Sequence, residues 1–547
     1  MLRPLRTLFR LLVIARTLAR HDALEALEVL HVAPGLVWFA RLGSRHHVDG
    51  RPGQRLAWAL TELGPTFIKL GQFLSTRADL LGEQLAADLS ELQDRLPPFD
   101  STAARAAIEA ALGRPIDELF DRFENAPVTA ASIAQVHFAV TGRTLDGDVP
   151  GEPPDNPGAE PSALAGLMAA DPTSPAIDWE NREVAVKVLR PAIEQAFARD
   201  LELLYSLAEL VERTQPKLRR FKPLEVVGVF EETVRLEMDL RMEAAAAAEL
   251  AANFADDPTY HVPAVDWQRT SRRVMTQERV GGTPLDDREA LLAAGHDLTE
   301  VLTKAAAVFF KQVFRDGFFH GDQHPGNMSV DAEGNIVAVD FGIMGRLDRR
   351  TRYYLADMLL ATLARDYHLL AEVHVEAGFL PPGQPPDVFA QALRSVCEPI
   401  FGRSLNQISF ARLLAQLFQL TEAFDMPVQP QLLLLQKNML MAEGVSRSLD
   451  SSLNIWTLAE PLIAEWVREN RGPEARLRDA AQDLGDSLQR LPRLLSDVER
   501  ASGEIASSGL RLHPDSAKSL APRGEGAGRL AMWVAAAALV AALVALL

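Results

Sequence analysis

The chain has 547 residues, enough for more than one compact domain, and 48% of them are apolar, enough for a sizeable buried core. Its formal net charge of −18 argues against a protein that binds nucleic acid by general charge attraction. The single cysteine, Cys397, excludes an intramolecular disulfide and any metal cluster built on several cysteines.

Residues 1–30 form a basic and apolar N-terminal segment. Its first twenty residues contain arginines interleaved with Leu, Phe, Val and Ile, and only beyond them does the first acidic residue, Asp22, occur. This composition predicts an amphipathic helix that lies on a membrane surface.

A helical extension is expected over residues 31–125. Pro65 suits the first position of a helix. In the run Lys69-Leu70-Gly71-Gln72, the Lys69 and Gln72 side chains stand three residues apart on one helix face. They can therefore reach one target together.

A loop without glycine follows between two strand-like segments, over residues 129–137. Ala130, Ala131 and Ser132 lie within it. Each alanine carries a Cβ that disfavours left-handed backbone, so this loop is predicted to be stiffer than a glycine-rich one. Residues 141–181 then form an insertion dominated by proline, glycine and acidic residues, which predicts a disordered or loosely ordered hairpin tip.

The next strand is expected over residues 183–188, where apolar residues alternate and Lys187 is included. A carboxylate-rich helix contains Glu237, Asp239 and Glu243. Asp239 and Glu243 are four residues apart, and Glu237 and Arg241 are as well, so each pair is predicted to share a helix face.

Two polar motifs follow a long helical pattern. The first is His320-Gly321-Asp322-Gln323-His324-Pro325-Gly326-Asn327, and the second, Asp340-Phe341-Gly342, comes directly after an apolar strand-like run. This order of Asp, Asn and Asp is typical of phosphoryl-transfer enzymes, in which a strand lysine also reaches the phosphates of ATP.

The motifs assign roles to individual residues. Asp322 positions the attacking hydroxyl or water, Asn327 and Asp340 hold Mg²⁺, and Lys187 binds the phosphates of ATP. Glu243 is expected to hold Lys187 in place, with Glu237 as the alternative. Ala130, Ala131 and Ser132 would cover the phosphates in place of a glycine-rich loop.

The C-terminal part begins with helical patterns, which extend to about residue 471. A polar connector is expected over residues 472–528, followed by a transmembrane helix over residues 529–547. The uninterrupted apolar run of residues 530–547 would reach about 27 Å as a helix, close to the thickness of a bilayer core. Arg523 and Arg529 precede it, so the positive-inside rule places the preceding domains in the cytoplasm.

These motifs together resemble the UbiB family of atypical kinases, also called aarF-domain-containing kinases. The matching features are Lys69-Leu70-Gly71-Gln72 (the KxGQ signature), the alanine-rich loop, Lys187, Glu237 with Asp239, the segment from His320 to Asn327, and Asp340. The resemblance implies an α+β, kinase-like two-lobed fold, with an N-lobe over residues 126–280 and a mainly helical C-lobe over residues 281–471. It also implies that the KxGQ helix covers the active site and that Lys69 approaches Glu237 and Asp239.

The function implied by the resemblance is an ATP- and Mg²⁺-dependent kinase or ATPase that supports ubiquinone biosynthesis at the bacterial inner membrane. Its partners would be membrane lipids or quinone precursors and other ubiquinone-biosynthesis proteins. Two alternatives stay open: a small-molecule phosphotransferase of the aminoglycoside or choline kinase type, and a nucleotide-gated organiser of lipids or biosynthetic proteins without turnover. The KxGQ run and the apolar C-terminus count against the first alternative.

Overall fold

The computed structural model describes most of the chain up to Trp466. The described residues are 3–23, 50–75, 85, 88–89, 92, 96–142, 177–214, 222–401, 416–417, 420–421, 423–426, 429–450, 466, 468 and 470. The chain divides into two compact units, Met1–Trp466 and Val467–Leu547. Every helix and strand given below belongs to the first unit.

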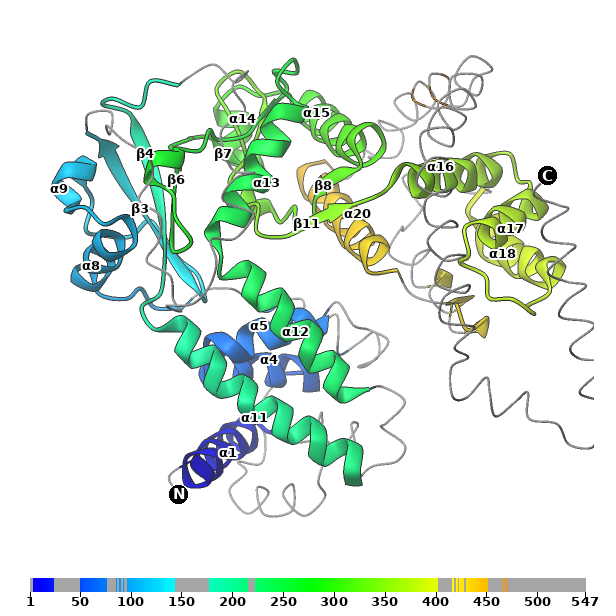
Figure 1. Cartoon of the computed structure of the whole chain (residues 1–547). Coiled ribbons are helices and arrows are strands. Elements are labelled where there is room, and N and C mark those ends of the chain that lie inside the picture. The colour runs from blue at the N-terminus through cyan, green and yellow to red at the C-terminus, as the bar shows by residue number, and fades with distance from the viewer. Residues whose placement is uncertain are drawn as a thin grey trace, which may run out of the picture. The chain divides into compact units, whose positions relative to one another are not determined.

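An antiparallel sheet forms the N-lobe (Figure 1). It consists of β1 (Phe120–Phe123), β2 (Thr129–Ala130), β3 (Ala134–Thr141), β4 (Glu183–Leu189) and β6 (Val274–Glu278), in the order β1-β3-β4-β6 with β2 paired to β3. Because side chains alternate along a strand, β4 has two different faces. Val184, Val186 and Val188 pack toward α8 (Ser101–Leu112), whereas Leu189 joins the core that contains α13 (Leu240–Asn253). Lys187 is therefore on the α13 side.

The segments expected to hold the catalytic motifs lie among short strands beyond this sheet. One sheet has the order β5-β10-β9-β7, and β8 pairs with β11. Their bounds are β5 (Tyr260–His261), β7 (Thr283–Pro284), β8 (Phe318–His320), β9 (Met328–Val330), β10 (Ile336–Ala338) and β11 (Met344–Arg346). Before β8, α15 (Leu298–Phe310) continues into a π-helical turn, Lys311–Asp316. Gly317 ends it with a φ of +67°, and a Cβ there would lie 2.4 Å from the Leu347 carbonyl oxygen, so this position requires glycine.

The carboxylate-rich segment forms two helices, and the prediction of one continuous helix is wrong. The first, α12 (Pro223–Glu237), ends before Asp239, which is the N-cap of α13. The Asp239 side chain accepts a hydrogen bond from the Arg241 amide at 3.1 Å and pairs with the Arg241 guanidinium at 2.7 Å. The expected pairing of Glu237 with Arg241 is therefore replaced. An aspartate that satisfies free amides at a helix start favours a new helix there.

The N-terminal helices pack beside α11 (Ile193–Thr214) and α12. They are α1 (Arg3–Arg20), α4 (Pro52–Leu63) and α5 (Pro65–Ser75), and α5 begins at the proline that the sequence predicts. The Arg10 guanidinium binds the Asp200 carboxylate through contacts of 2.9 and 3.0 Å. Leu18 and Ala19 are buried against Ala59 of α4. This part of the apolar face of α1, which the sequence predicted to lie on a membrane surface, therefore packs against α4.

The C-lobe is mainly helical. Its helices are α14 (Arg288–Ala293), α15, α16 (Arg349–Leu363), α17 (Tyr367–Glu376), α18 (Pro386–Phe401) and α20 (Pro430–Leu449). Within the described ranges no helix has both the length and the apolarity to cross a membrane. The predicted connector and transmembrane helix, residues 472–528 and 529–547, lie outside those ranges, as does most of the insertion at residues 141–181.

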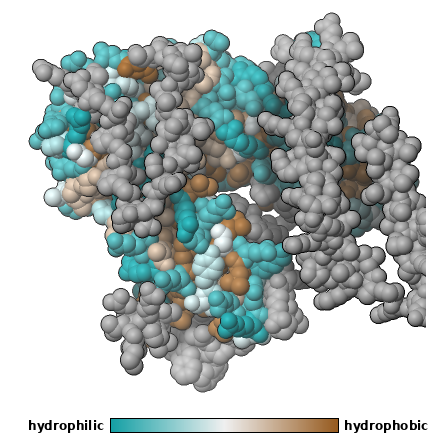
Figure 2. All heavy atoms as spheres, viewed as in Figure 1, coloured by the Kyte–Doolittle hydropathy of each residue, from teal (hydrophilic) through white to brown (hydrophobic). Residues whose placement is uncertain are grey.

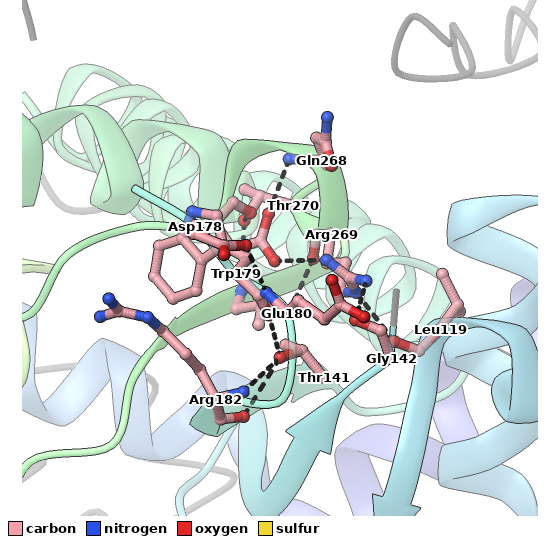
Figure 3. A network of polar contacts seen from close by, with 12 residues as sticks. Leu119, Thr141, Gly142, Asp178, Trp179, Glu180, Arg182, Gln268, Arg269 and Thr270 are labelled. Atoms are coloured by element: carbon pink, nitrogen blue, oxygen red, sulfur yellow. Dashed lines mark hydrogen bonds and ion pairs between the residues drawn. The ribbon is translucent and has the colours of Figure 1, made fainter. Parts of the chain in front are cut away.

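A polar network closes the base of this insertion (Figure 3). Thr141 and Arg182 exchange backbone and side-chain hydrogen bonds, including two of 2.9 Å. Beside them Arg269 is fully buried and donates to the Leu119 carbonyl and the Asp266 carboxylate, both at 2.8 Å. Arg269 thereby ties β6 and the turn before it to the end of α9 (Ile116–Leu119).

The described surface mixes polar and apolar side chains (Figure 2). Large exposed apolar residues include Leu210 on α11, Val229 and Leu236 on α12, and Trp58 on α4. Scattered apolar residues are normal on protein surfaces, so these alone identify no partner.

We expect Arg269→Met to lower the free energy of unfolding by about 3–5 kcal/mol, because it leaves the buried Asp266 carboxylate without its cation. The measurement is chemical denaturation followed by tryptophan fluorescence. Arg213→Met is the matched control, since Arg213 forms an exposed pair with Glu209 at 3.4 Å and should contribute at most about 1 kcal/mol. Equal losses in the two variants would contradict the structural role of Arg269.

Candidate active site

Lys187 lies between two carboxylates that come from different parts of the chain. Its Nζ is 2.6 Å from Oε1 of Glu243 on α13 and 3.4 Å from Oδ2 of Asp340. Glu243 is buried, whereas 45% of the Asp340 side chain is exposed. Between the two acids considered for Lys187, the structure pairs Glu243 and not Glu237. The arrangement joins strand β4, helix α13 and the Asp340-Phe341-Gly342 segment.

Electrostatics keep Lys187 and Asp340 charged. Burial alone would lower the pKa of Lys187, but the charges of Asp340 and Glu243 outweigh it and raise that pKa. Desolvation would raise the pKa of Asp340, but Lys187 and a hydrogen bond from the Gly342 amide lower it to about 2. The site therefore holds an ammonium beside an ionised, accessible carboxylate at neutral pH.

Local hydrogen bonds fix the loop that contains Asp322. The Asp322 amide donates to Nδ1 of His320 at 3.1 Å, and the Asn327 side-chain amide donates to the Asp322 carbonyl at 3.2 Å. The His320 amide in turn donates to Oε1 of the buried Gln312 at 2.9 Å. Burial lowers the pKa of His320, consistent with a neutral imidazole that accepts through Nδ1. Hydrogen bonds within the loop and to the π-helical turn thus help to set its conformation.

Asn327 and Asp340 offer donors that suit magnesium. The Val339 amide donates to the Asn327 carbonyl at 3.1 Å, which ties the two motifs together directly before Asp340. A carboxylate and an amide oxygen are hard ligands, and Mg²⁺ in nucleotide sites commonly takes only one or two protein ligands beside phosphates and water. Among the described residues there is no cluster of three or more His, Cys, Asp or Glu that could hold a metal alone.

The KxGQ helix α5 is anchored to α12. Lys69 Nζ lies 2.9 Å from Oε2 of Glu237, and both side chains are mostly buried. Phe73 packs on Phe230 with 5.6 Å between ring centroids. Gly71 has a packing role, because a Cβ there would come within 2.4 Å of the Leu92 side chain. Of the two acids expected near Lys69, Glu237 is its partner, whereas Asp239 caps α13.

Gln72 lies on α5 three residues after Lys69 and is half-buried. Its backbone carbonyl accepts a hydrogen bond from the Ser75 hydroxyl at 2.7 Å. The helix therefore places Gln72 near Lys69, as the spacing predicts, and its action on a nucleotide stays a prediction.

The alanine-rich loop is the tip of the β2–β3 hairpin. The Ala131 amide donates to the Ala134 carbonyl at 2.8 Å, and neither Ala130 nor Ala131 has a positive φ. Arg190, which follows β4, donates to the Ala131 carbonyl from Nε at 3.2 Å and from a terminal nitrogen at 2.9 Å. Ser132 is fully buried, so its hydroxyl would have to move to meet a nucleotide. The hydrogen bonds from Arg190 to the Ala131 carbonyl therefore stabilise this loop.

Sequence reasoning missed two groups at the site. One is Arg190, since an arginine after a strand is usually a surface residue. The other is Lys437 on α20, whose Nζ lies 2.7 Å from Oδ1 of Asp322. Lys437 is the first charged residue of α20 after four consecutive leucines, a pattern that indicates a buried helix but not which loop the lysine reaches.

Two protein-family models match this chain. The ABC1 atypical kinase-like domain matches residues 91–148 and 176–374, and the UbiB helical domain matches residues 393–454. A solved Mycobacterium tuberculosis protein in complex with erythromycin aligns with a TM-score of 0.44 and 24% identity, over 74% of this chain and 93% of that one.

Two curated relatives are each named "Probable protein kinase UbiB". The protein of Marinobacter nauticus is 41% identical over 461 residues, which cover 84% of this chain and 78% of the relative. That of Xanthomonas axonopodis pv. citri is 43% identical over 446 residues, covering 80% and 74%. Identity at this level over most of both chains shows that the protein belongs to the UbiB family of atypical kinases.

Proposed function

We propose that this protein is a membrane-anchored kinase or ATPase that cleaves the γ-phosphoryl group from ATP in support of ubiquinone biosynthesis. The observation that carries the proposal is the contact of Lys187 with Glu243 and Asp340, at 2.6 and 3.4 Å. Such a lysine, held by a helix carboxylate beside a metal-binding aspartate, is the arrangement that kinases need for activity. The names of the two relatives support a protein kinase of the UbiB family.

The chain's own residues would divide the chemistry among them. Lys187 binds phosphate oxygens, and Asn327 and Asp340 hold Mg²⁺, which neutralises charge on the phosphates when it is bound. Asp322 accepts a hydrogen bond from the attacking hydroxyl or water. A new bond forms from that oxygen to the γ-phosphorus, ADP leaves, and the proton passes to Asp322 or to solvent.

The acceptor is proposed to be water or a small, lipid-like molecule such as a quinone precursor. The anchored α5 helix, with Lys69 on Glu237 and Phe73 on Phe230, supports this because Lys69 is also close enough to Asp340 for its charge to lower the pKa of that carboxyl. A partly buried ion pair and an aromatic contact resist displacement by a polypeptide substrate.

The protein is further proposed to be anchored in the bacterial inner membrane by residues 529–547, with the kinase domain in the cytoplasm. The support is the apolar run of residues 530–547 and the arginines before it, Arg523 and Arg529. An anchor of this kind would keep the site near lipid-soluble acceptors.

The first prediction concerns the two aspartates. We expect Asp340→Asn to lower Mg²⁺-dependent ATP binding and turnover by about 100-fold, because a charged metal ligand is lost. Asp322→Asn should leave ATP affinity nearly unchanged and slow turnover by roughly 100-fold. Calorimetric titration with ATP–Mg²⁺ and release of labelled phosphate measure the two effects. Asp387→Asn, at a largely exposed carboxylate, is the control; near-normal turnover in both site variants would refute the assignment.

The second prediction concerns the alanine-rich loop and the lid. Ala131→Gly should change nucleotide affinity by roughly two- to fivefold, because glycine opens backbone conformations that the alanine Cβ disfavours. Lys69→Met should also alter affinity, because Glu237 loses its cation. Titration with ATP and ADP, combined with melting temperature, separates this effect from unfolding. Ala106→Gly on the exposed side of α8 is the control, and unchanged affinity in both variants would make the loop and lid purely structural.

The third prediction concerns the anchor. A chain that ends at Gly528 should leave the membrane fraction almost completely, because the apolar run is removed and part of the α1 apolar face is already packed in the protein. Membrane flotation of the full-length and shortened chains tests this. Full-length protein found in the soluble fraction after gentle lysis would refute the anchor.

A further inference from the structure

Helix α20 reaches the loop expected to carry catalysis from more than one hundred residues further along the chain. Lys437 Nζ lies 2.7 Å from Oδ1 of Asp322, and each side chain is about one third exposed (33% and 29%). Figure 1 shows α20 beside β8, the strand that leads into this loop, and beside β11, which pairs with β8. The contact therefore lies at an accessible part of the site and not in the core.

The next residue of α20, Asn438, forms hydrogen bonds with the backbone of the same loop. Asn438 is fully buried; its Oδ1 accepts a hydrogen bond from the Gln323 amide at 3.2 Å, and its Nδ2 donates to the His320 carbonyl. These two loop residues stand on either side of Asp322. Consecutive residues of α20 thus fix the backbone around Asp322 and engage its carboxylate.

The charge pattern shows that this cation is specific to the contact. Lys437 is the only charged residue of α20 before Glu443, in a stretch rich in leucine and methionine. The loop itself, residues 320–327, contains no lysine or arginine. A surface salt bridge contributes little to stability, so a lone lysine placed on this carboxylate calls for another explanation.

We infer that Lys437 is a positioning residue for Asp322, so that the helical domain supplies part of the active site of the kinase-like domain. The inference rests on the proposed function. By engaging Oδ1, the ammonium fixes the orientation of the carboxylate and leaves Oδ2 as the oxygen that meets the acceptor hydroxyl or water. Small errors in the placement of a reacting group cost large factors in rate, so the contact acts on the chemical step rather than on ATP binding. The two family matches agree with this division, because Asp322 lies in residues 176–374 and Lys437 in residues 393–454.

The test separates a positioning role from a structural one by steady-state kinetics of ATP–Mg²⁺ turnover with the full-length protein. Lys437→Met should lower kcat by about 10- to 100-fold. KM for ATP should stay within about twofold, because Lys437 does not contact the ATP-binding lysine or its partners. Lys437→Arg should recover most of kcat, since it restores a cation near Asp322. Lys222→Met, at an exposed pair with Glu225, is the matched control and should leave both constants unchanged.

A double variant completes the test. If Lys437 acts through Asp322, adding Lys437→Met to Asp322→Asn should cause no further loss of kcat. Independent, multiplicative losses, or an unchanged kcat in Lys437→Met, would overturn the inference while the proposed function stands. Should Lys437→Met melt at a lower temperature, Lys437→Gln and Lys437→Arg give the same comparison, and a kcat that tracks melting temperature across the series would also overturn it. Wild-type protein that binds ATP–Mg²⁺ and releases no ADP would overturn the proposed function itself.

Discussion

The ion pair between Lys187 and Glu243 is the contact on which the rest of the site depends. Charges taken out of water are costly unless they are paired closely, so the buried Glu243 and its lysine constrain where β4 and α13 can lie. Asp340 completes the group from the C-lobe side. Whatever sets the position of α13 therefore also sets the position of Lys187.

The short segment between α12 and α13 links the Lys187–Glu243 pair to the KxGQ helix. Glu237, the last residue of α12, binds Lys69 of the KxGQ helix, and Asp239, two residues later, caps α13. The segment Glu237–Asp239 thus connects the KxGQ helix α5 to the helix that holds Lys187. A shift of α5 would be transmitted to Lys187 along only a few residues of backbone.

Local sequence patterns correctly predicted those helices and strands whose conformation depends mainly on their own residues. Alternating apolar residues indicated β4, and Pro65 indicated the start of α5. The break between α12 and α13 was missed because acids at four-residue spacing fit a continuous helix as well as two helices. Its signal was Asp239, a residue type that favours the N-cap position, directly before Leu240.

Contacts between distant segments were harder to predict. Lys69 was expected near Glu237 only through the family resemblance, and nothing in the local sequence pointed Arg190 toward the Ala131 carbonyl or Lys437 toward Asp322. These contacts depend on how helices and loops pack, which a single sequence with a helical period does not specify. The leucine-rich sequence of α20 does indicate burial, but not which loop the helix covers.

The hydrogen bonds at the base of the insertion isolate its length from the geometry of the N-lobe sheet. In the β3–β4 hairpin, Lys187 pairs with Val136 near the alanine-rich loop, whereas Glu183 pairs with Val140 next to the Thr141–Arg182 network. The matched kinase-like domain omits residues 149–175, which belong to this insertion. Because hydrogen bonds between Thr141 and Arg182 hold the two strands together at that end, the length of the insertion can change without altering the pairing of Lys187 with Val136. The same position would accept an inserted reporter or affinity tag with little disturbance of the candidate active site.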